Sequence, residues 1–230
     1  MELASPTRAL QKDNQMLIHN RVSRSTANGP GDRSVVWFQG CSLACAECWN
    51  KDTHKFDIKK DESILALAQW ILDQDAEGVT FSGGEPFQQA PGLLVLIDIL
   101  KDAKPNFSIG SFTGYTLKEL QEGKYQWWST AYNQWVAGDT KMSKEILSKM
   151  DFIIAGRYNA LKRVDDKPLC GSSNQEVHFL TTRYKLSDLT GNIVEMTIDS
   201  DSGLIQITGF PDQPDRVGDD NDDDSRLVAA

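Results

Sequence analysis

The chain has 230 residues, of which 40% are hydrophobic and 25% charged, a composition typical of one globular domain with appended segments. Its formal net charge of −9 argues against a general nucleic-acid-binding role, because such proteins need basic surface to displace phosphate counterions. No run approaches the roughly 20 apolar residues that span a bilayer, and the beginning of the sequence contains no continuous apolar signal segment. We therefore expect a cytoplasmic protein with neither a membrane nor a nucleic acid as partner.

The charge is concentrated near the end of the sequence. Residues 211–230 contain seven aspartates and two arginines, which together supply more than half of the net charge. This segment has almost nothing to bury, so we expect a disordered acidic tail. Residues 1–15 show no clear hydrophobic period and are expected to form a flexible N-terminal arm.

Between these ends, short apolar runs alternate with segments of helical period. Val35–Phe38 is wholly apolar, as expected of a parallel strand that is covered on both faces. Asp61–Gln74 has apolar residues at helical spacing, and Asp61 is a suitable N-cap. The alternation predicts an α/β fold, with a parallel sheet that could form a partial barrel and chemistry at the carboxyl ends of its strands. The other predicted elements are, in chain order, a strand at Val79–Phe81, a helix at Pro91–Lys101, a strand at Phe107–Phe112, helices at Leu117–Gln121 and Lys144–Met150, and a strand at Asp151–Ile154.

The pattern changes late in the chain. Val194–Ile198 and Leu204–Thr208, joined through Asp201-Ser202-Gly203, are predicted to form an antiparallel β-hairpin. We therefore expect a core at residues 16–182, and a C-terminal β-hairpin extension at residues 183–210 ahead of the tail.

The four cysteines divide into a group and a single residue. Cys41, Cys45 and Cys48 share one loop directly after the first predicted strand, whereas Cys170 stands alone. This distribution does not resemble a disulfide framework, and clustered thiolates in a reducing compartment more often bind metal. Three thiolates can bind three irons of a 4Fe-4S cluster and leave the fourth iron open to a substrate or cofactor. A zinc site completed by Cys170 is the alternative that the spacing leaves open.

A second motif follows the next predicted strand and consists of Gly83, Gly84, Glu85 and Pro86. Two successive glycines let the backbone approach a ligand closely. The cysteine triplet and this Gly-Gly-Glu-Pro element together resemble the radical S-adenosylmethionine superfamily. The resemblance implies that the three cysteines hold a 4Fe-4S cluster whose open iron chelates S-adenosylmethionine. It also implies that the end of this strand holds the amino group of that cofactor, where Glu85 could offset the cationic sulfonium or ammonium group.

Four further segments of the sequence are informative: Asn28–Arg33, Trp37–Cys41, Phe112–Thr116 and Gly171–Gln175. They resemble one branch of the superfamily, the anaerobic ribonucleotide reductase activating proteins and their relatives, over residues 16–179. The resemblance implies a partial (β/α) barrel of the radical S-adenosylmethionine type and a glycyl-radical-activating function. In that function, reductive cleavage of S-adenosylmethionine gives methionine and a 5′-deoxyadenosyl radical, which takes a hydrogen atom from a backbone glycine of a partner. The implied partners are a glycyl radical enzyme, first of all anaerobic ribonucleotide reductase, and an electron donor such as flavodoxin or ferredoxin.

Single residues near these motifs are further candidates for cofactor binding. Trp49, directly after the triplet, is a candidate to pack against the cluster or the adenine, with a simple core tryptophan as the alternative. Glu47 and Cys48 are also candidate cofactor contacts, although many radical enzymes have an aromatic residue where this chain has Glu47. Thr113, at the end of the third predicted strand, either contacts the cofactor or serves a structural turn. Cys170 is expected to be a buried bystander, because a fourth cysteine ligand would close the open iron.

Two other functions remain open at this point. A radical S-adenosylmethionine enzyme that modifies a small molecule or a peptide would need a closed cavity with specific polar groups. A non-catalytic iron–sulfur or zinc-binding protein would bind metal but would not cleave S-adenosylmethionine.

Overall fold

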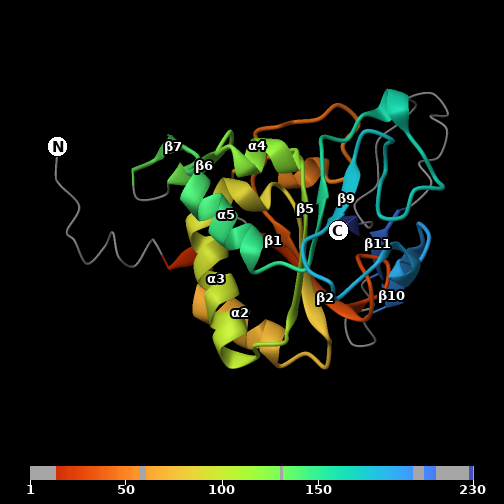
Figure 1. Cartoon of the computed structure of the whole chain (residues 1–230), viewed down its shortest axis with the longest axis horizontal. Helices are drawn as coiled ribbons and strands as arrows, with labels where there is room; N and C mark the ends of the chain where they lie inside the picture. The colour runs from red at the N-terminus through yellow and green to blue at the C-terminus, as the bar shows by residue number, and fades with distance from the viewer. Residues whose placement is uncertain (1–13, 57–60, 130–131, 199–204, 211–227, 230) are drawn as a thin grey trace.

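The computed structural model describes residues 14–56, 61–129, 132–198, 205–210 and 228–229. At its centre lies a seven-stranded mixed sheet with the strand order β3-β1-β2-β4-β5-β8-β9 (Figure 1). The strands of this sheet are β1 (Gln15–Ser25), β2 (Arg33–Phe38), β3 (Asp61–Ser63), β4 (Gly78–Gly83), β5 (Ser108–Thr113), β8 (Phe152–Ala155) and β9 (Glu176–Phe179). The remaining strands are β6 (Gln126–Ser129), β7 (Gln134–Ala137), β10 (Val194–Ile198), β11 (Ile205–Gly209) and β12 (Val228–Ala229). The α-helices are α2 (Ile64–Leu72), α3 (Ala90–Ala103), α4 (Leu117–Gln121) and α5 (Thr140–Ser148).

The middle of the sheet is parallel. β2 pairs with β4, β4 with β5, and β5 with β8, each in parallel, whereas β1, β3 and β9 form antiparallel pairs. Helix α2 lies in sequence between β2 and β4, α3 between β4 and β5, and α4 and α5 between β5 and β8. This arrangement confirms the α/β class and brings the carboxyl ends of the parallel strands to one edge of the sheet.

The two faces of the sheet are covered differently. Helices α2, α3 and α5 lie together on one face (Figure 1). Val36 and Phe38 of β2 join the large core under these helices, whereas Val35 and Trp37 pack on the opposite face. All residues of β2 are buried, and its stretch Val35–Phe38 is apolar rather than alternating, as the sequence predicts.

The predicted helices correspond to α2, α3, α4 and α5; α4 has the predicted bounds, whereas the ends of the other three are shifted. The helix expected at Asp61–Gln74 begins only at Ile64, because Asp61–Ser63 pair with β1 as strand β3. The assignment of Asp61 as N-cap is therefore wrong: Ser63 occupies the cap position, and its side chain makes no capping hydrogen bond. Pairing with β1 holds the residues before the helix in an extended conformation that local spacing did not reveal.

The C-terminal strands lie on the side of the sheet away from the helices (Figure 1). β10 and β11 pair antiparallel, with Glu195 opposite Thr208. The expected turn Asp201-Ser202-Gly203 lies outside the described residues, as do most of the expected N-terminal arm and acidic tail.

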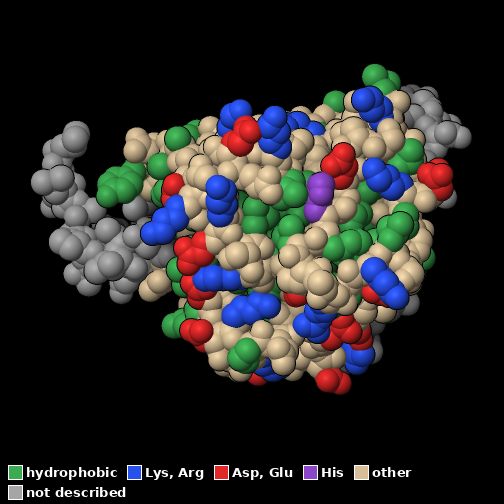
Figure 2. Space-filling view, viewed as in Figure 1, with side chains coloured by type: hydrophobic (Ala, Val, Ile, Leu, Met, Phe, Trp, Pro, Cys, Tyr) green, Lys and Arg blue, Asp and Glu red, His purple; other side chains and the backbone are tan. Residues whose placement is uncertain are grey.

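The surface carries charges of both signs. Figure 2 shows Lys, Arg, Asp and Glu side chains interspersed over the visible face, with apolar side chains between them. Within the part of the chain that the structure describes, no helix combines the length and the apolar character needed to cross a bilayer.

Candidate functional site

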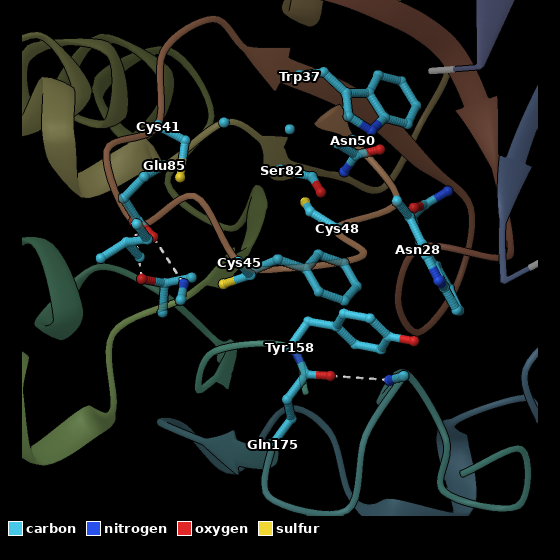
Figure 3. Close-up of a pocket in the computed structure, with 18 of the residues that line it drawn as sticks. Asn28, Trp37, Cys41, Cys45, Cys48, Asn50, Ser82, Glu85, Tyr158 and Gln175 are labelled. Atoms are coloured by element: carbon cyan, nitrogen blue, oxygen red, sulfur yellow. Dashed lines mark hydrogen bonds between the residues drawn. The ribbon is translucent and has the colours of Figure 1, made fainter. Parts of the chain in front are cut away.

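The loop that carries the three cysteines directly follows β2. Ala44 (φ 43°) and Glu47 (φ 58°) adopt the left-handed conformation that residues other than glycine rarely take. The amide of Cys48 donates to the carbonyl of Cys45 at 3.2 Å, which forms a turn between the second and third cysteines. All three thiols are free and half-buried. Figure 3 shows that the sulfur atoms of Cys41, Cys45 and Cys48 face the same part of one pocket.

Hydrogen bonds attach this loop to the segment after the Gly-Gly-Glu-Pro motif. The side-chain carbonyl of Gln88 accepts the amide of Ser42 at 2.8 Å, and its NH2 group donates to the Ser42 hydroxyl at 2.7 Å. The amide of Glu85 donates to the carbonyl of Gly40 at 2.9 Å. The two motifs that the sequence singled out are therefore joined directly.

The cysteines line a pocket of about 360 Å³ at the carboxyl ends of the parallel strands. This volume lies within the roughly 300–1,000 Å³ of small-molecule pockets. The segments Ser82–Glu85 at the end of β4 and Phe112–Gly114 at the end of β5 contribute to the lining, together with Trp49. The candidates Cys41, Cys45, Cys48, Trp49, Gly83, Gly84, Glu85 and Thr113 thus line one space.

The two glycines of the motif make room for the protein's own backbone. Gly83 has a φ of +89°, and a Cβ there would lie 2.6 Å from the amide nitrogen of Phe38. A Cβ on Gly84 would lie 2.3 Å from the carbonyl oxygen of Gly40. Both positions require glycine because the end of β4 lies directly against the start of the cysteine loop.

Glu85 is buried, with 1% of its surface exposed, and its carboxylate binds groups of the protein itself. Oε1 accepts the hydroxyl of Thr113 at 2.8 Å and the amide of Phe87 at 3.0 Å, and Oε2 accepts the amide of Gly114 at 2.7 Å. Burial raises the pKa of Glu85 to about 7, against the opposing effect of these hydrogen bonds. Glu85 and Thr113, both expected to contact cofactor, therefore first of all connect the ends of β4 and β5.

Trp49 sits in a row of aromatic side chains. Its ring centroid lies 5.7 Å from that of Tyr158 and 5.5 Å from that of Phe210. Its indole Nε1 is buried and has no hydrogen-bond partner among the described residues. The same holds for Nε2 of His54, which also lines the pocket. Such unsatisfied polar atoms in a pocket fit a site that receives a ligand.

Two predicted residues lie elsewhere. Glu47 is not part of the pocket lining that the described residues form, and its carboxylate lies 3.9 Å from Nζ of Lys51. Cys170 is fully buried in an apolar cluster with Phe152 and Leu169, where its Sγ lies 3.6 Å from the carbonyl oxygen of Gln175. The structure therefore places Cys170 as a core thiol outside the pocket lining.

Asn174 and Gln175 belong to the segment Gly171–Gln175 that resembles the activating proteins. Oε1 of Gln175 accepts the amides of Gly171 and Ser172 at 3.0 and 3.1 Å, and Nδ2 of Asn174 donates to the carbonyl of Arg157 at 2.8 Å. Both side chains thus hold the loop that forms one side of the pocket, on which Gln175 and Tyr158 are labelled in Figure 3. The polar residue types alone could not have distinguished this role from ligand binding.

The residues present fit an iron–sulfur cluster through the chemistry of their donors. Within the described residues, no three His, Cys, Asp or Glu side chains converge on one point as ligands of a single metal ion do. The cysteine thiols instead face a common space, and ligands of a 4Fe-4S cluster bind different irons. Burial raises the pKa of Cys41 to about 12, with the charge of Glu85 as a further cause, and burial also raises the pKa of Cys48. Both thiols must release a proton on binding iron.

A comparison with protein-family models identifies the segment that carries this site. Residues 27–178, more than half of the chain, match the family described as "4Fe-4S single cluster domain". The matched segment includes the cysteine loop, the Gly-Gly-Glu-Pro motif and the parallel strands β2, β4, β5 and β8.

Curated relatives are activating enzymes. The chain is 42% identical over 93 residues to the pyruvate formate-lyase-activating enzyme of Clostridium pasteurianum, a match that covers 38% of each protein. It is 26% identical over 174 residues to the anaerobic ribonucleoside-triphosphate reductase-activating protein of Escherichia coli K12, which covers 72% of this chain and 99% of that protein. It is 28% identical over 184 residues to the pyruvate formate-lyase-activating enzyme of Staphylococcus aureus USA300, which covers 75% of this chain and 63% of that protein.

Proposed function

Since the chain belongs to the 4Fe-4S single cluster domain family, and within it to the radical S-adenosylmethionine enzymes that activate glycyl radical enzymes, we propose that it generates a glycyl radical on a partner. The observation that carries this proposal is the set of three free thiols that face one pocket at the carboxyl ends of the parallel strands, while Cys170 lies in the core. Three ligands leave one iron of a 4Fe-4S cluster for another molecule.

The residues of the pocket have separate tasks in this proposal. Cys41, Cys45 and Cys48 hold the cluster. When bound, the cluster and S-adenosylmethionine supply a reductive cleavage that yields methionine and a 5′-deoxyadenosyl radical. Gly83 and Gly84 bring the backbone at the end of β4 close to the site, so that its peptide groups can receive the amino-acid part of the cofactor.

Other residues of the chain position these groups and exclude water. Glu85 and Thr113 fix the ends of β4 and β5 relative to each other through their hydrogen bond. Trp49 offers an apolar ring and an unpaired N–H to the pocket, which suits packing against the adenosyl part. Glu47 contributes through its left-handed backbone, which turns the loop between Cys45 and Cys48.

We propose that the sheet is the partial (β/α) barrel of the radical S-adenosylmethionine type. Support comes from the helices, which gather on one face (Figure 1). It also comes from the pocket, which is lined by Trp37 of the opposite face and by the ends of β4 and β5. In this arrangement the helices form the outside of the barrel and the pocket its inside.

The proposed partner is a glycyl radical enzyme, first of all an anaerobic ribonucleotide reductase, because the relative of that name is matched over 99% of its length. A pyruvate formate-lyase is the second candidate, on the strength of the other relatives. The electron for cleavage would come from a donor such as flavodoxin or ferredoxin, in a reducing compartment such as the cytoplasm that keeps the ligand thiols reduced.

Cofactor cleavage tests the cluster part of the proposal. The full chain is reconstituted anaerobically with iron and sulfide, reduced with dithionite and mixed with S-adenosylmethionine, and 5′-deoxyadenosine is measured by chromatography. We expect cleavage by the wild type and by Cys170→Ala, and none by Cys45→Ala. Iron binding without cleavage in the wild type would instead indicate a non-catalytic metalloprotein.

A further inference from the structure

The C-terminal hairpin supplies one wall of the pocket. Ile207, Thr208 and Gly209 of β11 line it, as does Phe210, which follows the strand. These residues lie beyond position 178, the last position that the family model matches. A segment outside the shared core therefore takes part in the site.

Phe210 connects this wall to the cysteine loop. Its ring packs edge-on against Trp49, with centroids 5.5 Å apart and an interplanar angle of 73°, and lies 6.3 Å from the ring of Phe112 at the end of β5. Trp49 follows Cys48 directly in the sequence. Phe210 thus fixes the side chain that lies next to the third cluster ligand.

A small set of polar contacts holds the hairpin in place. The carboxylate of Glu195 accepts the hydroxyl of Ser25 and both the amide and the hydroxyl of Thr26, the last two at 2.8 and 2.6 Å. Nδ2 of Asn28 donates to the hydroxyl of Thr208 at 2.8 Å. These contacts all reach the segment that leads from β1 to β2.

The end of β11 is fitted closely to the chain before β10. Gly209 has a φ of +103°, and a Cβ there would lie 2.1 Å from the carbonyl oxygen of Ile193. The opposite side of the hairpin is solvent-accessible, with Met196 62% exposed. A segment attached by a few hydrogen bonds and one aromatic side chain can open locally at lower cost than the core.

We propose that β11 and Phe210 close the pocket on the side of Trp49, and that Phe210 is the positioning residue of this closure. The closed wall shields the pocket from solvent and restricts the polypeptide segment that can reach the cofactor. The closure stands on the geometry alone, whereas its effect on hydrogen abstraction rests on the proposed function.

Thiol accessibility in the metal-free full chain tests the closure directly. The rate at which N-ethylmaleimide alkylates Cys48 is measured at fixed pH by peptide mass spectrometry. We expect Cys48 to be alkylated about tenfold faster in the Phe210→Ala variant than in the wild type. The reason is that the variant lacks the Phe210 ring and therefore its contacts with Trp49 and Phe112. Phe210→Tyr, which keeps the ring, should stay close to the wild-type rate. Met196→Ala, on the exposed side of the same hairpin, serves as the matched control and should leave the rate unchanged.

A second variant covers the case in which Phe210→Ala does not fold, as judged by circular dichroism. Glu195→Gln weakens the attachment of the hairpin without changing the pocket lining, and should also speed alkylation of Cys48. If the folded Phe210→Ala and Glu195→Gln variants were alkylated at Cys48 at the wild-type rate, the proposed closure would be overturned.

The coupling between cofactor cleavage and glycyl radical formation tests the functional consequence of the closure. Reconstituted wild type and Phe210→Ala are compared for the amount of 5′-deoxyadenosine formed per glycyl radical on an anaerobic ribonucleotide reductase. We expect this ratio to rise several-fold in Phe210→Ala, because an open pocket admits the reductant, which can quench the radical before it takes a hydrogen atom from the partner. An unchanged ratio would overturn the role in coupling, whereas absence of a radical with the wild type, despite protected thiols, would count against the proposed function and not the closure.

Discussion

The hydroxyl of Thr113 donates to Oε1 of Glu85 at 2.8 Å, so the carboxylate of the Gly-Gly-Glu-Pro motif is bonded to the end of the neighbouring strand. The amides of Phe87 and Gly114 also donate hydrogen bonds to this carboxylate. The motif therefore has a structural task besides the cofactor binding that its sequence suggests. A substitution at Glu85 will change both, whereas Thr113 allows the structural task to be examined alone.

Replacing Thr113 by Val removes the hydroxyl that serves Glu85 and that also accepts the amide of Tyr115 at 3.1 Å. We expect the free energy of unfolding of the metal-free chain to fall by about 1–3 kcal/mol, because a buried acceptor loses a donor. Urea denaturation followed by circular dichroism measures this change. Thr113→Ser keeps the hydroxyl and should lose much less; equal stability of the Val variant and the wild type would contradict the assigned bond.

The raised pKa of Glu85 predicts a pH dependence of stability. Its pKa is about 7 in the folded chain, against a reference value of 4.5, because burial disfavours the charged carboxylate. The folded chain therefore holds the proton more tightly, and the contribution of Glu85 to stability is complete below about pH 4.5 and is lost as the pH rises through about 7.

Glu85→Gln isolates this contribution, since the amide does not titrate. We expect the unfolding free energy of the metal-free wild type, relative to the variant, to decline between pH 5 and 8 by an amount on the order of 3 kcal/mol. Urea titrations of both proteins across this range provide the measurement. If the unfolding free energies of the two proteins changed with pH in parallel, burial would not raise the pKa of the Glu85 carboxylate in this way.

The unpaired Nε1 of Trp49 predicts a role in ligand binding. Trp49→Phe keeps an apolar ring but removes the N–H, so the cluster-loaded, unreduced protein should bind S-adenosylmethionine about tenfold more weakly, the value of one hydrogen bond. Equilibrium dialysis measures the affinity without turnover. Trp70→Phe, on α2 and outside the pocket lining, is the matched control, and equal affinities of the two variants would assign Trp49 to packing alone.

Cys170 provides a test of the number of cluster ligands. Its thiol lies in the apolar cluster around Phe152, and burial raises its pKa. We expect Cys170→Ala to keep the wild-type iron and sulfide content after reconstitution, with a loss of about 1 kcal/mol in stability from the smaller side chain. Cys48→Ala should lose most of the iron. A Cys170 variant that cannot hold the cluster would indicate a closed four-cysteine site.

Local patterns in the sequence were sufficient to predict the parallel strands and helices in the middle of the fold. The stretch Val35–Phe38 of β2 is apolar because both faces of this strand are buried. The helix α4 lies at the predicted residues Leu117–Gln121, where Thr116 and Glu119 form a capping box. The spacing of the motifs also predicted where the pocket lies. Because β4 and β5 are parallel neighbours, the residues at their carboxyl ends lie at the same edge of the sheet.

The edges of the sheet and the walls of the site depend on contacts between distant residues, which no local pattern reveals. β3 exists because it pairs with β1, and Asp61 therefore lies in a strand. Arg33 is fully buried because Thr80, the Ser108 hydroxyl and the carbonyl of Val79 accept its guanidinium hydrogen bonds. These partners come from two neighbouring strands of the folded sheet, so the charge of Arg33 gave no indication of burial.

Transfer of the radical to a partner protein is the central claim, and electron paramagnetic resonance tests it most directly. The reconstituted full chain is incubated anaerobically with an anaerobic ribonucleotide reductase, dithionite and S-adenosylmethionine, and a parallel sample contains a pyruvate formate-lyase. The account predicts a glycyl radical doublet on one of these partners. Its splitting should collapse to a single line when the partner carries glycine deuterated at Cα, and the signal should be absent with the Cys45→Ala variant. Cleavage of S-adenosylmethionine with no radical on either partner would contradict it.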